Sequence, residues 1–411
     1  MSIVRVTGEH RGRLQPDHRI DSRKTRRRNS GETKSTRREA TLGTVLRGFT
    51  VGITADRRWD EQAALFERRN ATVVHAPTIR TIPLGSDASL RAATDEVLAR
   101  RPSVFVANTG LGVRSWLGAA ESWGVGDELL DILRAAHIFA RGPKASGAIH
   151  SAGLDVAGRA ASERMSEAID MALEVLRPGD LIAVQVDGSG TSPELARLHD
   201  FGAEVIEVPV YEWKLPEDHR PAIRLAEAVI AGRIHAVTFT TGPAARNWFA
   251  ITEERNLAEP LRAALTSGQV VVGCIGPVCA ESLVGEGIGA EHFVTPDAWR
   301  LGPLVRSVAN ALAEHVVTVD VRGARLTLAG NHASVDGSPV TLTDIDARLL
   351  ARLVTRPNVV HTKSDLLGAV WGNQGGDPHA VEVAIGRLRN RLGDAGAAIA
   401  SIHRRGYILN T

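Results

Sequence analysis

Residues 377–393 have the sequence DPHAVEVAIGRLRNRLG, which predicts an amphipathic helix with basic residues on its outer side. Asp377 and Pro378 form a strong helix start, and Gly393 is a common helix stop. At 100° per residue one side is apolar and should face a core, namely Val381, Ile385, Leu388 and Leu392. The other side carries His379, Val383, Gly386, Arg387 and Asn390. This outer side is therefore a candidate binding surface.

The outer side of this helix has the chemistry needed to read duplex DNA. Arg387 can bond to a guanine edge and Asn390 to an adenine edge, while Arg389 and Arg391 on the flanks are expected to reach phosphates. The alternative is that these arginines only form a solvated helix face. After the helix, residues 399–403 and 407–409 predict two short strands joined by a basic tip, a wing. The wing residues expected to contact DNA are Ser401, His403, Arg404 and Arg405.

Two further helices precede the basic one. Thr343 with Asp346, and Thr362 with Asp365, are variants of the capping box, which satisfies free amides at a helix start. With VTLTDIDARLLARLV, VVHTKSDLLGAVWG, HAVEVAIGRLRNRL and SIHRRGYIL, the stretch from about 324 to 409 resembles the OmpR/PhoB-type winged-helix domain of response regulators. The resemblance implies double-stranded DNA as a partner and a homodimer on paired half-sites. The operator sequence stays open.

The length and charge of the chain indicate how many domains to expect and how charge is distributed among them. A chain of 411 residues exceeds what one hydrophobic core normally holds, so two or three domains are expected. Two cysteines and no secretory or transmembrane apolar run favour a reduced, cytoplasmic protein without membrane contact. The net charge of +2 hides an uneven distribution, because residues 1–40 hold 12 basic and 5 acidic side chains and residues 324–411 hold 10 and 7. The middle holds the remaining 27 basic and 35 acidic side chains, so it is acidic.

Residues 1–45 are predicted to be a disordered basic extension. RKTRRRNSGETKSTRR within it has no large apolar residue and cannot support a core. The extension is either an arm that binds phosphates or an unstructured segment, including one produced by a start codon placed too early.

The middle of the chain contains an internal repeat with a spacing near 133 residues. VFVANTGLGVRSWL, from Val104, is echoed by VTFTTGPAARNWFA, from Val237, and the turns Gly142-Pro143 and Gly276-Pro277 mark the same place in each copy. Each copy repeats an apolar strand, a turn of small residues and an amphipathic helix, which is typical of a parallel sheet covered by helices. Two such units predict a bilobal α/β module. Its ligand should bind in the cleft, where turns meet helix amino termini.

The repeat resembles uroporphyrinogen-III synthase, the HemD family, over about 265 residues. The resemblance rests on GFTVGITADRRWDEQAALFERRNATVVHAP, FVANTGLGV, GDLIAVQVDGSGTSPELARLHDFGAEVIEVPVYEWKLP, FTTGPAARNWF and IGPVCAESLVGEGI. It implies two parallel-sheet lobes, with the chain leaving lobe one near Pro77 and returning near Tyr211. The expected domains are a HemD-like module at 46–314, with lobe one at 46–80 and 213–314 and lobe two at 81–212, a linker at 315–323, and an α+β winged-helix domain at 324–411.

Enzymes of that family close hydroxymethylbilane to uroporphyrinogen III, losing water and inverting one pyrrole ring. Such chemistry needs an enclosure that fixes a polycarboxylate and stabilises developing charge. The resemblance places Tyr211 near the leaving group, as the candidate catalytic residue if the chain is an enzyme. The alternative is an aromatic side chain that packs at the hinge. The candidate ligand-binding residues are Thr54, Asn108, Thr109, Gly110, Gly142, Ser189, Gly190, Thr191, Thr240, Thr241, Gly276 and Cys279.

Several other kinds of site are not indicated. Cys274 and Cys279 are too few and wrongly spaced for zinc, so they are read as small buried residues, with a lowered pKa at a helix start as the alternative for Cys279. The 14 histidines show no metal or triad pairing, and ANTGLG lacks the glycine spacing of a dinucleotide site. No metal and no cofactor are expected.

The sequence favours a transcription regulator whose HemD-like module senses a small molecule, such as a tetrapyrrole precursor or a related metabolite. Lobe movement would then alter the geometry of the dimer on DNA. The alternative is an active uroporphyrinogen-III synthase with a DNA-binding tail. The 44 arginines against 5 lysines suggest a GC-rich genome, in which tetrapyrrole, siroheme and nitrite-assimilation genes are the expected targets. The effector and the direction of regulation stay open.

Overall fold

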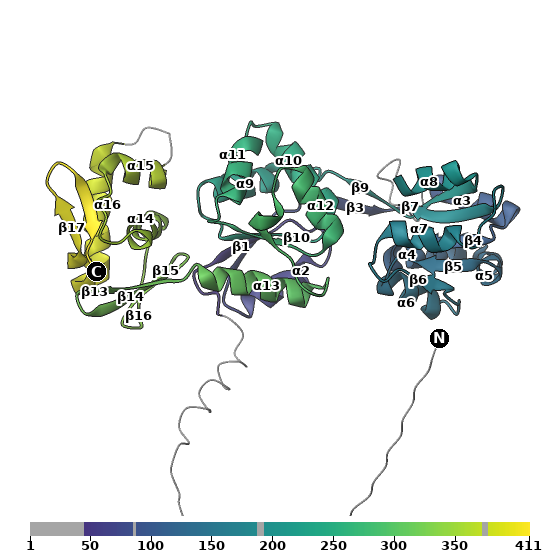
Figure 1. The fold of residues 1–411 in the computed structure, drawn as a ribbon, viewed down its shortest axis with the longest axis horizontal. Helices are drawn as coiled ribbons and strands as arrows, with labels where there is room; N and C mark the ends of the chain where they lie inside the picture. Colours follow the sequence, from purple (N-terminus) through teal and green to yellow (C-terminus); the bar gives the residue numbers. More distant parts are fainter. Residues whose placement is uncertain (1–44, 85–87, 187–192, 372–376) are drawn as a thin grey trace, which may run out of the picture. The chain divides into compact units, whose positions relative to one another are not determined.

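The computed structural model describes residues 45–411 except 85–87, 187–192 and 372–376 (Figure 1). All but Val45 of the predicted basic extension lies outside the described residues, as do the candidate ligand residues Ser189, Gly190 and Thr191. The described part belongs to one compact unit, Thr44–Thr411.

Lobe one is built on a parallel sheet with the strand order β12-β11-β10-β1-β2. Its central strands are buried along most of their length because they are short apolar runs covered on both faces. One face packs on α2 and α13, and the other on α9 to α12. The elements are β1 (Thr50–Ile53), α2 (Trp59–Glu67), β2 (Thr72–His75), α9 (Arg220–Ile230), β10 (Ala236–Phe239), α10 (Gly242–Glu253), α11 (Ala258–Thr266), β11 (Val271–Cys274), α12 (Pro277–Gly285), η1 (Ala290–His292), β12 (Phe293–Val294) and α13 (Leu301–Glu314).

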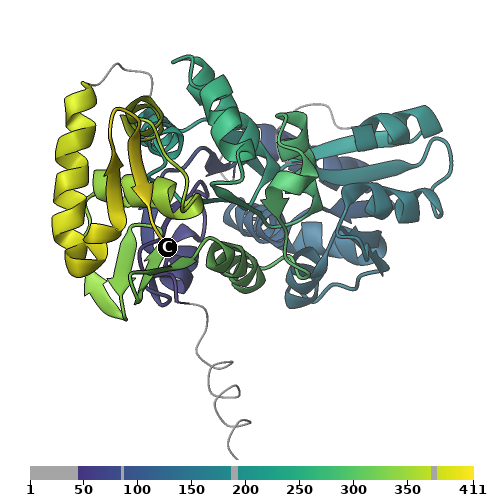
Figure 2. The same cartoon turned by 60° about the vertical axis from the view of Figure 1, so that its left-hand side comes forward.

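Lobe two has a second parallel sheet, in the order β6-β5-β4-β7-β8. Helices α3 to α6 contribute to the core on one face and α7 and α8 to the core on the other, so helices cover both faces of each sheet. Figure 2 shows the same ribbon turned by 60° about the vertical axis. The elements are α3 (Ala88–Arg100), β4 (Val104–Ala107), α4 (Gly110–Ser122), α5 (Gly126–Ala135), β5 (His137–Ala140), α6 (Pro143–Ser151), β6 (Gly158–Arg159), α7 (Met165–Leu173), β7 (Leu181–Val186), α8 (Pro193–Phe201) and β8 (Glu204–Pro209).

The internal repeat predicted from sequence is confirmed as a repeat of structure. The series β4-α4-α5-β5-α6-β6 in lobe two corresponds to β10-α10-α11-β11-α12-β12 in lobe one, with the same order in its sheet. The chain crosses between the lobes twice, through the antiparallel pair β3 (Arg80–Pro83) and β9 (Tyr211–Lys214). The predicted bilobal α/β fold is therefore confirmed.

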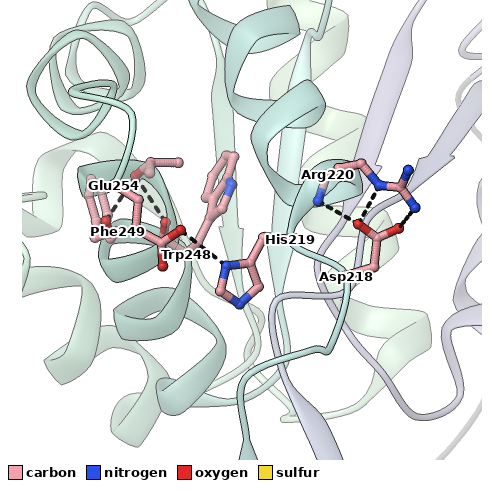
Figure 3. Close-up of polar contacts among 7 residues, drawn as sticks. Asp218, His219, Arg220, Trp248, Phe249 and Glu254 are labelled. Atoms are coloured by element: carbon pink, nitrogen blue, oxygen red, sulfur yellow. Dashed lines mark hydrogen bonds and ion pairs between the residues drawn. The ribbon is translucent and has the colours of Figure 1, made fainter.

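The start of α9 is fixed by polar contacts that Figure 3 shows. Asp218 accepts hydrogen bonds from the backbone and the guanidinium of Arg220, and these bonds lower the pKa of Asp218 to about 2. The ring of His219 lies 3.3 Å from a carboxylate oxygen of Glu254. Trp248 of α10 donates to the carbonyl of Ala222 in the buried interior. Helix α9 is thus held against α10 at its amino end.

The carboxyl-terminal domain combines a small sheet, three helices and a hairpin. An antiparallel sheet in the order β13-β14-β15-β16 precedes the helices. One core joins this sheet, the helices and the hairpin. The elements are β13 (Val317–Val321), β14 (Ala324–Ala329), β15 (His332–Val335), β16 (Ser338–Val340), α14 (Asp344–Thr355), α15 (Lys363–Trp371), α16 (Pro378–Leu392), η2 (Gly393–Ala398), β17 (Ile399–Ile402) and β18 (Gly406–Leu409).

The helix boundaries in this domain agree with the predicted caps. Thr343 forms a complete capping box with Asp346, and Asp377 accepts from the amide of His379 at the start of α16. The predicted winged-helix fold is confirmed. The expected linker at 315–323 is wrong, because residues 317–321 form strand β13, which pairs along its length with β14. None of the helices in the described ranges combines the length and apolar character that crossing a bilayer requires.

Candidate ligand cavity and DNA-binding surface

A cavity of about 640 Å³ is lined by residues from both lobes. Most of its walls are turns that follow the carboxyl ends of strands, which is where parallel α/β sheets bind ligands. Turns after β1, β10 and β11 contribute from lobe one, and turns after β4 and β5 contribute from lobe two. The predicted residues that line it are Asn108, Thr109, Gly110, Gly142, Tyr211, Thr240, Thr241, Gly276 and Cys279.

Thr54 differs from this group, because it is fully buried and does not line the cavity. Its hydroxyl donates to the carbonyl of Thr238 at 2.8 Å, which ties β1 to β10. The next residues, Ala55 to Arg58, are the ones that reach the cavity. The expectation that Thr54 contacts a ligand is therefore replaced by a structural role.

The amino termini of α4 and α10 hold equivalent positions at the cavity. A Cβ on Gly110 would lie 2.2 Å from the carbonyl oxygen of Lys144, and one on Gly242 would lie 2.3 Å from Oγ of Ser282. Each glycine therefore lets its helix start close to the helix that follows the Gly-Pro turn. Thr109 caps α4 by accepting from the amide of Gly112, whereas Oγ1 of Thr241 is buried with no partner in the described part of the chain.

Five cationic side chains line the cavity and were not among the predicted site residues. They face only two carboxylates, Asp56 and Glu163, so the lining has an excess of positive charge although the middle of the chain is acidic. Several of them flank the predicted turns, and this proximity in sequence is the signal that could have found them. The cationic residues are Arg57, Arg58, Arg114, Arg141 and Lys144.

The cations differ in how far they are neutralised. Arg141 donates to Oδ1 of Asn108 at 2.7 Å, and Arg58 pairs with Glu61. Arg57 and Arg114 form no hydrogen bond or ion pair with any other residue that the structure describes. These two guanidinium groups are available to an anion.

Lys144 lies among the other cations, and its surroundings disfavour its charged form. Burial, followed by the positive charges of Arg58, Arg300 and Arg141, lowers the pKa of its ammonium group, and Glu163 opposes this shift. An anion bound beside Lys144 would raise that pKa again. The cavity therefore has the electrostatics of an anion site.

The two lobes also meet through an ion pair. Arg164, just before α7 in lobe two, lies 2.7 Å from a carboxylate oxygen of Glu281 in α12 of lobe one. Both side chains are about half exposed. This pair stabilises the arrangement in which the cavity is lined from both sides.

Tyr211 lies at the start of β9 and lines the cavity while being only 4% exposed. Its ring packs 5.6 Å from that of Trp213, and its backbone pairs with Pro83 of β3. Both alternatives considered for Tyr211 therefore fit its position, since it borders the cavity and packs at the hinge.

The two cysteines form a buried pair at the start of α12. The hydrogen bond that the Cys279 thiol donates to the sulfur of Cys274, together with burial, raises the pKa of the Cys279 thiol well above its usual value. A lowered pKa at the helix start, the alternative considered for Cys279, is therefore wrong. No group of three or more residues suited to a metal ion occurs within the described ranges.

The outer side of α16 is open to solvent. His379, Arg387 and Asn390 are exposed, and Val383 is 45% exposed although it is apolar. The opposite side, from Val381 to Leu392, enters the core as the periodicity predicts. A Cβ on Gly386 would meet nothing within 4 Å, so this glycine leaves room beside the helix.

Arg389 and Arg391 have intramolecular partners. Arg389 donates to the carbonyl of Ile399 and to Oγ of Ser401, and its guanidinium lies 5.7 Å from the ring of Tyr407. Arg391 lies 3.0 Å from the buried carboxylate of Asp346. These contacts give both arginines a role inside the domain, and the expectation that they reach phosphates stays a prediction.

The wing carries exposed basic residues at its tip. His403, Arg404 and Arg405 are exposed in the turn between β17 and β18, and Arg404 adopts a left-handed conformation with φ 59°. Ser401 is exposed as well, but its hydroxyl accepts from Arg389. The surface that we expect to be offered to DNA therefore consists of the outer side of α16 and the tip of the wing.

Comparisons with known proteins divide the chain in the same way. A family model described as uroporphyrinogen-III synthase HemD matches residues 60–305, and one described as transcriptional regulatory protein, C terminal, matches residues 337–409. The uncharacterized protein YjjA of Bacillus subtilis (strain 168) is 25% identical over 280 residues, 66% of this chain and 99% of that protein. A mutant uroporphyrinogen III synthase from the extremely thermophilic bacterium Thermus thermophilus is 26% identical, with a TM-score of 0.52 over 65% of this chain and 99% of that chain. The transcriptional regulatory protein PrrA of Mycobacterium tuberculosis (strain H37Rv) is 31% identical over 105 residues, 25% of this chain and 45% of that protein.

Proposed function

Because the chain belongs to the uroporphyrinogen-III synthase HemD family and ends in an OmpR/PhoB-type DNA-binding domain, we propose that it is a transcription regulator that senses an anionic ligand in its HemD-like module. The ligand class is a small polycarboxylate, such as a tetrapyrrole precursor. A homodimer on paired half-sites near tetrapyrrole, siroheme or nitrite-assimilation genes is the corresponding arrangement on DNA.

The observation that carries the sensing role is the charge of the cavity. Five cations face two carboxylates, and neither Arg57 nor Arg114 has a partner within the described residues. Cations of one sign that line a concave site raise the local concentration of anions more than the same groups spread over an open surface. A polycarboxylate would satisfy several of them at once.

Ligand binding can be measured by calorimetric titration with uroporphyrin III, a stable octacarboxylate. Replacement of Arg114 by Gln should weaken binding by about tenfold or more, because a charge-assisted hydrogen bond is worth roughly 1.5–3 kcal/mol. Arg134→Gln is the matched control, since Arg134 is an exposed arginine of the same lobe that pairs with Asp131 outside the cavity. Equal affinities for the two variants would contradict the assignment of the cavity.

DNA binding can be tested by selecting duplexes from a random-sequence library with the complete chain. Arg387→Ala should lose about 1–3 kcal/mol of discrimination at one base position of the selected site and keep its affinity for phosphates. A selection that yields no preferred sequence would contradict sequence-specific recognition. Addition of uroporphyrin III should then change the affinity of the protein for the selected duplex. An unchanged affinity at saturating ligand would contradict the coupling between ligand binding and DNA binding.

The second candidate function is uroporphyrinogen-III synthase activity, which the position of Tyr211 at the cavity favours. Incubation with hydroxymethylbilane followed by analysis of the isomer distinguishes the two functions, because the uncatalysed reaction gives the type I product. Exclusive formation of type I would remove the enzyme candidate. Formation of type III that falls in Tyr211→Phe would establish it alongside DNA binding.

A further inference from the structure

The carboxyl-terminal domain contacts lobe one through two glycines that face each other. The turn between β14 and β15 contains Gly330, and the turn before β1 contains Gly48. The amide of Asn331 donates to the carbonyl of Gly48 at 2.8 Å. A Cβ on Gly330 would lie 2.4 Å from that carbonyl oxygen, and one on Gly48 would lie 2.2 Å from the carbonyl oxygen of Ala329. The two backbones are therefore as close as residues without side chains allow.

His235 and Ala329 extend this contact into the core of lobe one. Nδ1 of His235 accepts from the amide of Thr50, and its ring meets that of Phe49 edge to face. A Cβ on Gly330 would also approach Nε2 of His235 to 3.1 Å. Ala329 packs against the same core cluster as Phe49. The turn of the DNA-binding domain is thus seated on the amino ends of β1 and β10.

Arg348 of α14 makes a second contact between the DNA-binding domain and lobe one, and it is separate in the sequence from the two glycines. Its guanidinium donates to the carbonyl of Ala231, which follows α9, at 3.2 Å, and to the carbonyl of Val370 in α15 at 2.6 Å. A cation between the carboxyl ends of two helices is favoured by both helix dipoles. Because α9 is held against α10 at its other end, this contact reaches the interior of lobe one.

The docking surface lies at the opposite ends of the strands from the cavity. Strand β1 begins beside Gly48 and leads to Ala55, which lines the cavity. We propose that the contacts of Gly330, Asn331 and Arg348 join lobe one and the DNA-binding domain into one rigid body, so that closure of the cavity moves lobe two against that body. Closure by a ligand rests on the proposed sensing function, but the rigid docking does not.

The docking does not cover the surface offered to DNA. Val383, Arg387 and Asn390 remain exposed in the complete chain, as does the wing tip. A ligand would therefore regulate DNA binding by changing the position of lobe two, for example within a dimer on DNA. Helix α16 stays uncovered throughout.

The docking can be tested with pairs of spin labels on exposed valines in the complete chain. Val284→Cys labels lobe one, Val175→Cys labels lobe two and Val359→Cys labels the DNA-binding domain; these valines are 52%, 44% and 42% exposed, whereas Cys274 and Cys279 are buried. The 284–359 pair should give one narrow distance distribution that uroporphyrin III leaves unchanged, while the 175–359 distribution shifts. A broad 284–359 distribution without ligand would overturn the docking.

A matched pair of glycine variants sharpens the test. Gly330→Ala should broaden the 284–359 distribution, whereas Gly337→Ala should not, because both glycines have positive φ, 54° and 80°, but only a Cβ on Gly330 meets other atoms within 4 Å. Equal distributions in the two variants would overturn the proposal. If Gly330→Ala does not fold, hydrogen exchange of the Asn331 amide in the unaltered chain tests the docking instead. We expect this amide to exchange at least about tenfold more slowly than an exposed amide. Equal exchange rates would overturn the docking. The 284–359 distribution without ligand, the glycine variants and the hydrogen exchange need neither DNA nor ligand, so their failure is distinct from failure of the proposed function. A 175–359 distribution that uroporphyrin III leaves unchanged would overturn the movement of lobe two but not the docking.

Discussion

His235 is a single residue whose protonation should affect the stability of the whole unit. Its partly buried position lowers the pKa of its imidazole to about 4 from 6.5; Asp344 opposes this shift and His315 adds to it. Because the unfolded chain binds the proton more tightly, stability should be complete above about pH 6.5 and should fall as the pH drops toward 4. The loss in the free energy of unfolding should be at most about 3 kcal/mol.

The variant His235→Asn separates this effect from other titrating groups. Its side-chain oxygen can still accept from the amide of Thr50, but it cannot gain a proton in this range. Denaturant unfolding between pH 4.5 and 7.5 should therefore show a smaller loss of stability in the variant than in the unaltered chain. A difference in stability between the two proteins that does not change with pH would contradict the assignment of this pH dependence to His235.

At the scale of the element, α16 contains arginines with different tasks. Arg391 bonds to Asp346, whose carboxylate also accepts from Thr343 in the capping box of α14, so Arg391→Ala should destabilise the DNA-binding domain by on the order of 1–2 kcal/mol. Arg387→Ala should leave the melting temperature unchanged and weaken specific DNA binding. Thermal unfolding and DNA titration of both variants measure the contrast. A loss of DNA affinity in Arg391→Ala without loss of stability would contradict it.

The elements themselves could largely be predicted from sequence, because their signals are local. Caps at Thr343 and Asp377, and the turns Gly142-Pro143 and Gly276-Pro277, each lie within a few residues of the helix that they start. The partners of Arg391 could not be predicted, since Asp346 lies 45 positions away and only the packed fold brings it close. Strand β13 escapes prediction because residues 315–323 lie between the two family resemblances, although their alternating pattern continues into a hairpin.

At the scale of the whole molecule, the candidate site depends on distant segments meeting. The turns at the cavity follow strands that the repeat predicts, but the local excess of cations could not be predicted, because the middle of the chain is acidic as a whole. Arg57 and Arg58 come from lobe one, and Arg114, Arg141 and Lys144 from lobe two. Their shared effect on an anion therefore arises only when both lobes line the same cavity.

The ion pair between Arg164 and Glu281 should accordingly control how easily the lobes stay together. Arg164→Ala should weaken uroporphyrin III binding by no more than about fivefold, since an exposed pair is worth up to about 1 kcal/mol, and the difference should shrink at high salt. Titrations at two ionic strengths measure both effects. Arg134→Ala, which breaks an exposed pair with Asp131 inside lobe two, should leave affinity unchanged. An equal loss in the two variants would mean that removal of positive charge, and not contact between the lobes, sets the affinity.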